Sequence, residues 1–208
     1  LKQAGIPFEE VMVRFDAFTP DSAFKQRLGQ LSPAGKVPVL VDGDLVVWDT
    51  LAIAEYVAER VPERQLWPHD IAERARARSI CAEMHSGFGA LRGACMMNIE
   101  ADLKHIGQII QRDRADVRKD LARIDEMWSG LLAQYGGPML FGQFTVADAY
   151  YAPVCMRISG YGLKVSPAVA AYVERVKALP GVAAWIQDAL AEKDFLDFEE
   201  PYRLNPAS

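Results

Sequence analysis

The stretch Gly35–Val41, which reads Gly-Lys-Val-Pro-Val-Leu-Val, decides how this chain is interpreted. Pro38 stands within a run of β-branched residues and has no N–H to donate, so the strand must end, bulge or lie at a sheet edge there. The next segment with strand character, Leu45 to Trp48, leads directly into a helix at Asp49-Thr50. The free N–H groups and the dipole at the start of a helix favour a negatively charged group. The sequence therefore predicts a corner that binds a peptide-like carboxylate.

The composition limits the kinds of partner. The chain has 208 residues, of which 50% are hydrophobic and 25% charged, so it can bury one good core and could hold two small domains. Its 23 Lys and Arg against 28 Asp and Glu give a net charge of -5, which offers nucleic acid no broad basic surface and anionic lipid no cationic face. No apolar run approaches the roughly 20 residues that span a bilayer, and the first residues lack the layout of a signal peptide. We therefore expect a small-molecule or protein partner.

The cysteines and histidines predict neither disulfides nor a metal site. Cys81, Cys95 and Cys155 are odd in number, far apart and set in helical patterns, which fits free thiols in a reducing cytosol. We interpret them as small buried hydrophobes rather than catalytic thiols. The three histidines share no ligand spacing, so no metal is expected.

The first half of the chain has mixed helix and strand signals. Gly5 and Pro7 are typical of a helix end, and four residues cannot form a helix alone. Because the chain also begins with Leu, we expect an upstream piece that carries the rest of this helix and the first strand. Strands are predicted at Phe8–Phe15, Val37–Val41 and Leu45–Trp48, the last two joined by an Asp-Gly turn as an antiparallel hairpin, and helices at Asp21–Leu31 and Thr50–Arg60.

The second half has only helical signals. A segment rich in breakers, Pro62–Pro68, suggests the boundary between two domains. Helices are predicted at Ile71 to about Met97, Asp113–Tyr135, Thr145 to about Ser159, Pro167–Leu179 and Val182–Glu192, with the tail from Glu199 as an irregular strap or a frayed end. We thus predict an α/β domain at 1–61, a linker at 62–70 and an all-α domain at 71–208.

Three motifs in this layout resemble one known family. Ser32–Leu40, Trp48–Ile53 and Phe141–Asp148 match the cytosolic glutathione transferase family in order and spacing, and the resemblance covers essentially the whole chain. It is nearest to bacterial zeta-like members of unassigned substrate. The resemblance implies a thioredoxin-like N-terminal domain, here without its first strand, followed by an all-helical C-terminal domain. It further implies glutathione as co-substrate, a cytoplasmic homodimer, and no role for nucleic acid or membrane.

The resemblance also assigns a glutathione site. In this family Pro38 would be cis and would turn the Val37 backbone outward to pair with the cysteinyl part of glutathione. Asp49 would offset the α-amino group of the γ-glutamyl end, and Thr50 would bind its carboxylate at the helix N-terminus. The usual pair is Glu-Ser, so Asp-Thr is a departure, and a simple N-cap is the alternative role for either residue. Lys36 is placed to reach a glutathione carboxylate, and a solvated lysine is an equally open interpretation.

Two further parts of the family pattern differ in what they imply. Thr145 and Asp148 would form an internal helix N-cap with a structural role. The group that activates the glutathione thiol, a Ser, Tyr or Cys, would lie upstream of Leu1, so the catalytic residue is unknown. Tyr56, Ser32 and Cys81 are not put in its place. A Ser there would favour thiolate attack on an electrophile, and a Cys would favour thiol exchange.

The electrophile site would lie against the predicted helix from Ile71. Its positions Ile80, Met84, Phe88, Leu91 and Cys95 form one apolar stripe, with His85 and Arg92 two turns apart on the adjacent face. One interpretation is a core stripe with a polar rim. The other is an electrophile site at His85, Phe88 and Arg92 that binds an acidic electrophile or a glutathione carboxylate.

Two classes of function stay open at this point. The first is an enzyme that transfers glutathione to a small electrophile or uses glutathione to isomerise it. The second is a non-catalytic module with the same fold that binds proteins. A plain thioredoxin-like redox protein is disfavoured, because the chain has no Cys-x-x-Cys and carries several added helices.

Overall fold

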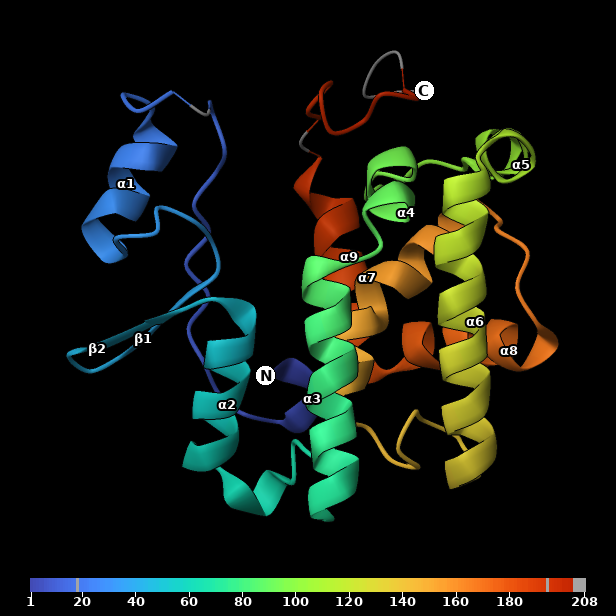
Figure 1. Cartoon of the computed structure of the whole chain (residues 1–208). Coiled ribbons are helices and arrows are strands. Elements are labelled where there is room, and N and C mark those ends of the chain that lie inside the picture. The colour runs from blue at the N-terminus through green and yellow to red at the C-terminus, as the bar shows by residue number, and fades with distance from the viewer. Residues whose placement is uncertain (18, 194, 204–208) are drawn as a thin grey trace. The chain divides into compact units, whose positions relative to one another are not determined.

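The computed structural model describes residues 1–17, 19–193 and 195–203 (Figure 1). The chain divides into two compact units, one formed by Ile6–Gln65 and the other by Leu1–Gly5 with Leu66–Ser208. The first holds a two-stranded sheet with helices, and the second is helical, which confirms the predicted fold class. The domain boundaries at residues 61 and 70 stay a prediction.

The smaller unit is built around a hairpin and two helices. Its elements are α1 (Ala23–Leu31), β1 (Val39–Asp42), β2 (Leu45–Trp48), α2 (Thr50–Arg60) and the short η2 (Pro62–Arg64). The strands pair antiparallel, with Asp42 opposite Leu45 at the turn and Val39 opposite Trp48 at the open end, as predicted. Gly43 in the turn has a φ of 61°, a conformation that glycine adopts without steric cost. The strand that was expected to start at Val37 starts at Val39, directly after Pro38.

The strand predicted at Phe8–Phe15 is wrong. These residues form no regular element in the described structure, where β1 and β2 pair only with each other. Val11 and Met12 keep 63% and 62% of their surface exposed. Alternation of apolar and polar side chains indicates which side chains would lie on each face of a strand. A strand forms only when a neighbouring backbone also pairs with its N–H and C=O groups. No such neighbour is present among the described residues.

The larger unit contains one short turn of helix and seven α-helices among the residues described. They are η1 (Lys2–Ala4), α3 (Ile71–Ser86), α4 (Gly89–Ala94), α5 (Lys104–Asp113), α6 (Ala115–Tyr135), α7 (Val146–Gly160), α8 (Pro167–Ala178) and α9 (Pro180–Glu192). The four helices predicted after residue 112 are confirmed to within two residues at each end. No helix in the described part of the chain has the length and hydropathy needed to span a bilayer.

The long helix predicted from Ile71 to about Met97 is wrong beyond Ser86. The chain leaves the helix at Gly87, and Phe88 takes a left-handed conformation with φ of 54° before α4 begins. A Cβ atom at position 87 would lie 2.6 Å from the carbonyl oxygen of Glu83, so the close turn requires glycine. The helical spacing of apolar residues continues across this break, so the spacing did not reveal that α3 ends there.

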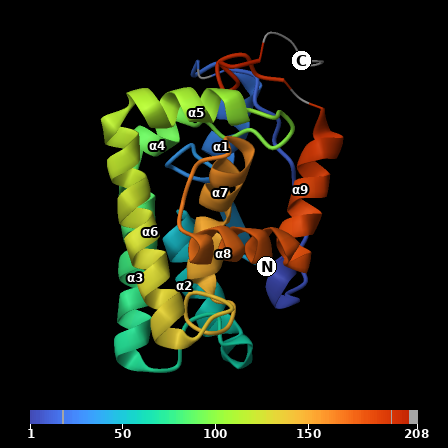
Figure 2. The same ribbon diagram turned by 90° about the vertical axis from the view of Figure 1, so that its right-hand side faces the viewer.

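The core of the larger unit surrounds α7, which packs against α3 and α8 (Figure 2). The Trp128 ring on α6 meets the rings of Tyr151 and Tyr172 edge-on, with centroids 5.2 Å and 4.9 Å away. All three side chains are almost fully buried. Edge-to-face aromatic packing adds about 0.5–1.5 kcal/mol per pair to the gain from burial, so this cluster is a main source of stability in the unit.

The first residues of the chain pack onto α9. The helix end predicted there is present, and Gly5 is the left-handed cap with φ of 63°. The Gln3 side-chain oxygen accepts a hydrogen bond of 2.8 Å from the Gly181 N–H, and the Lys2 ammonium pairs with Asp188. Leu1–Gly5 therefore belong with the helical unit rather than with the residues that follow them.

The chain after α9 forms an irregular segment over the end of α4. We call its described residues, 195–203, the strap. The Tyr202 hydroxyl donates a hydrogen bond of 2.8 Å to the carbonyl oxygen of Ala94. The part of the predicted tail at 204–208 lies outside the described residues.

Candidate functional site

The open end of the hairpin brings the two predicted halves of the corner together. Val39 pairs with Trp48, so Pro38 and Asp49 leave the sheet from the same end, directly after a cross-strand pair. Such paired residues have Cβ atoms about 4.5–5.5 Å apart. Two segments that are separated by a hairpin in the sequence thus form one surface.

The backbone of Val37 is available for hydrogen bonding at this surface. The bond between Val37 and Pro38 is cis, as the resemblance implied. Val37 lies outside β1, with 58% of its surface exposed. Among the described residues its N–H and C=O have no hydrogen-bond partner. An extended ligand can pair with such a backbone in the way that a neighbouring strand does.

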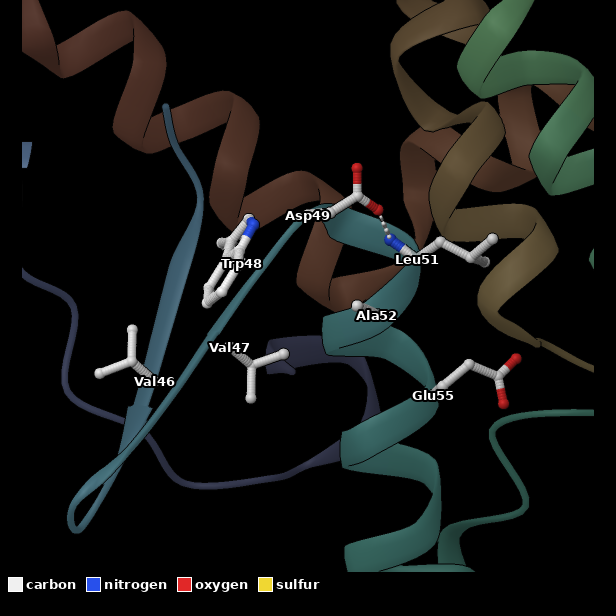
Figure 3. A pocket seen from close by; sticks show the side chains of 7 residues that line it. All are labelled: Val46, Val47, Trp48, Asp49, Leu51, Ala52 and Glu55. Atoms are coloured by element: carbon white, nitrogen blue, oxygen red, sulfur yellow. Dashed lines mark hydrogen bonds between the residues drawn. The ribbon is translucent and has the colours of Figure 1, made fainter. Parts of the chain in front are cut away.

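Asp49 has the N-cap role that the sequence left as an alternative. Its carboxylate accepts a hydrogen bond of 2.9 Å from the Leu51 N–H at the start of α2 (Figure 3). Its backbone has φ of 73° and ψ of 132°, which is unusual for a residue with a side chain. A conformation of this kind costs about 1–3 kcal/mol, and such outliers cluster at ligand sites. An N-cap residue usually has an extended backbone, so the cap by itself does not require this conformation.

Thr50 and Lys36 border the corner on either side. Thr50 is the exposed first residue of α2, where the helix dipole favours an anion. Lys36 is exposed at the end of the loop after α1. That loop is anchored by the Lys25 ammonium, which donates a hydrogen bond of 3.0 Å to the carbonyl oxygen of Gly35. The corner thus combines a lysine before Val37 with a helix N-terminus after Asp49.

An open hollow of about 620 Å³ lies beside the corner, between β2 and α2 (Figure 3). It is lined by Val46, Val47, Trp48, Asp49, Leu51, Ala52 and Glu55. Of the residues predicted for the glutathione site, only Asp49 lines it. The sequence reasoning missed the hollow, and the available signal was the apolar pair Leu51 and Ala52, which follows the exposed Trp48 after only Asp49 and Thr50.

The side chains that were set aside as thiol activators have structural contacts. The Tyr56 hydroxyl donates a hydrogen bond of 2.7 Å to Asp42, and this bond raises the pKa of Tyr56. Ser32 is buried, and its hydroxyl oxygen accepts a hydrogen bond of 3.2 Å from the Ala34 N–H. Cys81 is fully buried in α3. The expectation that the activating group precedes Leu1 stays a prediction.

The predicted electrophile residues do not share one helix. His85 lies on α3 and Arg92 on α4, so their expected stacking two turns apart on one helix is wrong. The Arg92 guanidinium instead donates hydrogen bonds to the carbonyl oxygens of His85, at 3.3 Å, and Gly87, at 3.5 Å. A cation at this position stabilises the C-terminal end of α3. Phe88 is buried, with 7% of its surface exposed. An electrophile-binding role for these three residues stays a prediction.

Thr145 and Asp148 form a reciprocal capping box at the start of α7. Asp148 is fully buried, and burial raises the pKa of its carboxyl group. It also accepts hydrogen bonds from the Leu140 N–H, at 3.1 Å, and from the Tyr172 hydroxyl, at 2.9 Å. The carboxylate therefore ties the loop before α7, the helix itself and α8 together, which is a structural arrangement.

Comparison with known proteins places the chain in a family. The model of the glutathione S-transferase N-terminal domain matches residues 1–60, and that of the glutathione S-transferase C-terminal domain matches residues 107–188. The chain belongs to the glutathione S-transferase family. The resemblance found in the sequence is thereby confirmed, and it rests on both halves of the chain.

Relatives of this glutathione S-transferase family member match most of its length. Glutathione S-transferase 1 of Dianthus caryophyllus is 28% identical over 163 residues, which cover 78% of this chain and 71% of the relative. A probable maleylacetoacetate isomerase of Caenorhabditis elegans is 31% identical over 144 residues, which cover 69% and 65%. A glutathione transferase homologue from Burkholderia gl BGR1, solved with bound glutathione, has a TM-score of 0.62 at 25% identity, covering 91% of this chain and 87% of that one.

Among the residues that the structure describes, no three or more His, Cys, Asp or Glu side chains gather closely enough to hold a metal ion.

Proposed function

We propose that this glutathione S-transferase family member binds glutathione at the corner formed by Lys36, Val37, Pro38, Asp49 and Thr50. The proposed reaction is transfer of glutathione to a small electrophile, or isomerisation of that electrophile by the glutathione thiolate. The name of the Caenorhabditis elegans relative favours isomerisation as the reaction to test first. The cytoplasmic location and the homodimer stay predictions.

The chemistry of glutathione fits the order of groups along the corner. Its cysteinyl amide can pair with the exposed backbone of Val37, as an added strand would. Its γ-glutamyl carboxylate can accept hydrogen bonds from the Thr50 hydroxyl and the start of α2, and Asp49 can offset the α-amino group. The Lys36 ammonium can pair with the glycine carboxylate. The observation that carries the proposal is the unpaired backbone of Val37 beside the N-terminus of α2 at one end of the hairpin.

Binding of glutathione to the purified chain tests the proposal directly. Calorimetric titration should give saturable binding of glutathione. Cysteinylglycine, which lacks the γ-glutamyl group, should bind at least about 10-fold more weakly, because it loses the charge-assisted hydrogen bonds at Asp49 and Thr50. The absence of saturable glutathione binding, or equal affinity for the two ligands, would refute this site.

Turnover then separates the two classes of function. An enzyme should convert a small electrophile in the presence of glutathione, at a rate that saturates with glutathione at the concentration seen in the titration. Binding by the full-length protein, which would carry the expected activating group, without turnover of a panel that includes haloarenes, epoxides and unsaturated carbonyl compounds would instead support the non-catalytic module.

The Asp49→Gly variant separates the N-cap role from the ligand role. Glycine adopts φ near 73° readily and loses only a few tenths of a kcal/mol as an N-cap, so the unfolding free energy should rise by about 1 kcal/mol or less. Glutathione affinity should fall, because the counter-charge for the α-amino group is lost. Urea unfolding and calorimetric titration measure the two effects. A stability gain with unchanged affinity would leave Asp49 as a cap alone.

A further inference from the structure

Side chains from distant parts of the chain hold the turn after α4. Three successive carbonyl oxygens there accept hydrogen bonds: that of Ala94 from the Tyr202 hydroxyl at 2.8 Å, that of Cys95 from the Arg157 Nε at 2.8 Å, and that of Met96 from the Tyr161 hydroxyl at 3.0 Å. Arg157 lies in α7 and Tyr161 is the first residue after that helix, whereas Tyr202 belongs to the strap. The Tyr161 and Tyr202 rings meet edge-on at 6.0 Å. One of the three attachments therefore depends on the position of the strap.

An ionic network fastens the strap at its end. The Arg203 guanidinium lies 2.6 Å from a carboxylate oxygen of Glu200 and 3.2 Å from one of Glu100, and Glu100 also pairs with Lys193 at 2.7 Å. The Asn98 amide donates a hydrogen bond of 2.7 Å to the same Glu200 oxygen. Two carboxylates thus face two cations across the contact between the strap and residues 98–100.

The central pair of this network is shielded from solvent. The Arg203 side chain is 4% exposed and that of Glu200 is 12% exposed. Removing one partner of such a pair leaves an uncompensated buried charge, which is far more costly than the pair itself is stabilising. Arg203 is also the one buried residue among those described in the strap, and its guanidinium lies over the Phe195 ring at 5.5 Å. With so little apolar burial of its own, the strap is the kind of segment that opens locally at low cost.

Cys95 lies between Ala94 and Met96, whose carbonyl oxygens accept the hydrogen bonds from Tyr202 and Tyr161. Its side chain is fully buried, and burial raises the pKa of its thiol to about 11. Burial and, after it, the nearby Cys95 raise the pKa of the Tyr202 hydroxyl. Lifting Tyr202 off Ala94 would remove the contact that the strap makes with the residue next to Cys95.

We propose that the strap is a releasable latch, held closed by the Arg203 network, and that its opening uncovers the Cys95 thiol. The latch lies wholly within the larger unit and does not depend on glutathione binding. The latch gives the chain a closed and an open state at the end of α4, and a small change in the Arg203 network can shift the equilibrium between them.

The Arg203→Met variant tests the latch. Methionine keeps an unbranched apolar stem but leaves Glu200 without its buried partner, so the strap should open more often. The rate at which N-ethylmaleimide labels Cys95, followed by peptide mass spectrometry, should rise at least about 10-fold over the wild-type rate. Cys155, which is fully buried in α7, serves as the internal reference and should keep its slow rate.

Arg112→Met is the matched control. Arg112 pairs with Asp113 at 2.7 Å, but the two side chains are 71% and 53% exposed, so this variant should label Cys95 at the wild-type rate. Tyr202→Phe, which keeps the ring and loses the hydrogen bond to Ala94, should give a smaller increase of a few-fold. A wild-type rate in Arg203→Met, or equal acceleration of Cys95 and Cys155, would overturn the proposal, since the second result reports global unfolding.

Discussion

The Asp148→Ala substitution is expected to lower the unfolding free energy by at least about 3 kcal/mol. The carboxylate accepts hydrogen bonds from two backbone N–H groups, those of Leu140 and Thr145, and from two hydroxyls, those of Thr145 and Tyr172. All of these bonds are buried. Each buried donor that loses its acceptor costs about 1–3 kcal/mol, so partial relaxation still leaves a large loss.

A second acidic N-cap provides the control for this result. Asp70 accepts hydrogen bonds from the Ala72 N–H, at 2.8 Å, and the Glu73 N–H, at 3.0 Å, in an exposed position at the start of α3. Asp70→Ala should therefore cost about 1 kcal/mol. Urea unfolding followed by tryptophan fluorescence compares the two variants. Similar losses would show that the additional buried donors around Asp148 contribute nothing beyond the cap.

The Thr50→Val substitution is expected to weaken glutathione binding at least about 10-fold, since a hydrogen bond to a charged group contributes about 1.5–3 kcal/mol. Valine keeps the branched shape of threonine and removes the hydroxyl. Thr50 is exposed at the first position of α2, after the Asp49 cap, so the unfolding free energy should change little. Calorimetric titration of the variant with glutathione measures the effect.

The matched control is Thr19→Val, which makes the same change at an exposed residue of the same compact unit, outside the corner. It should bind glutathione as the wild type does. If Thr50→Val also binds at the wild-type level while the wild type binds glutathione tightly, the carboxylate is held elsewhere and the proposed orientation of the ligand is wrong. If both variants lose binding equally, the loss does not come from the Thr50 hydroxyl.

Residue patterns predicted the elements of this chain where local chemistry is sufficient. The hairpin follows from two β-branched runs around an Asp-Gly turn, and α2 has the predicted bounds, Thr50–Arg60, with Asp49 as its N-cap. The same reasoning failed at Phe8–Phe15, because alternation of side chains does not supply a pairing partner. It also failed at Gly87, where the need for a close turn against Glu83 is a property of the packed backbone.

Most of the candidate site could be predicted from the sequence, because the register of one hairpin holds its parts together. Val37 and Thr50 each lie two residues beyond the pair Val39–Trp48 at the open end of the hairpin, and that pairing is readable from the turn. The hollow beside the corner was not readable in this way. It depends on how β2 and α2 lie against each other, which a one-dimensional pattern does not contain.

By itself, the sequence determined the corner at the end of the hairpin, the start of α2 and the family to which the chain belongs. These features depend on residues that are neighbours along the chain or joined by a short turn. Only the tertiary structure decided that α3 ends at Ser86, that Asp148 reaches Leu140 and Tyr172, and that Arg203 closes on Glu100. Those contacts join residues that packing brings together from distant parts of the chain. They are stabilised by burial and by the pairing of polar groups, and the spacing of these groups in the sequence does not predict that they meet.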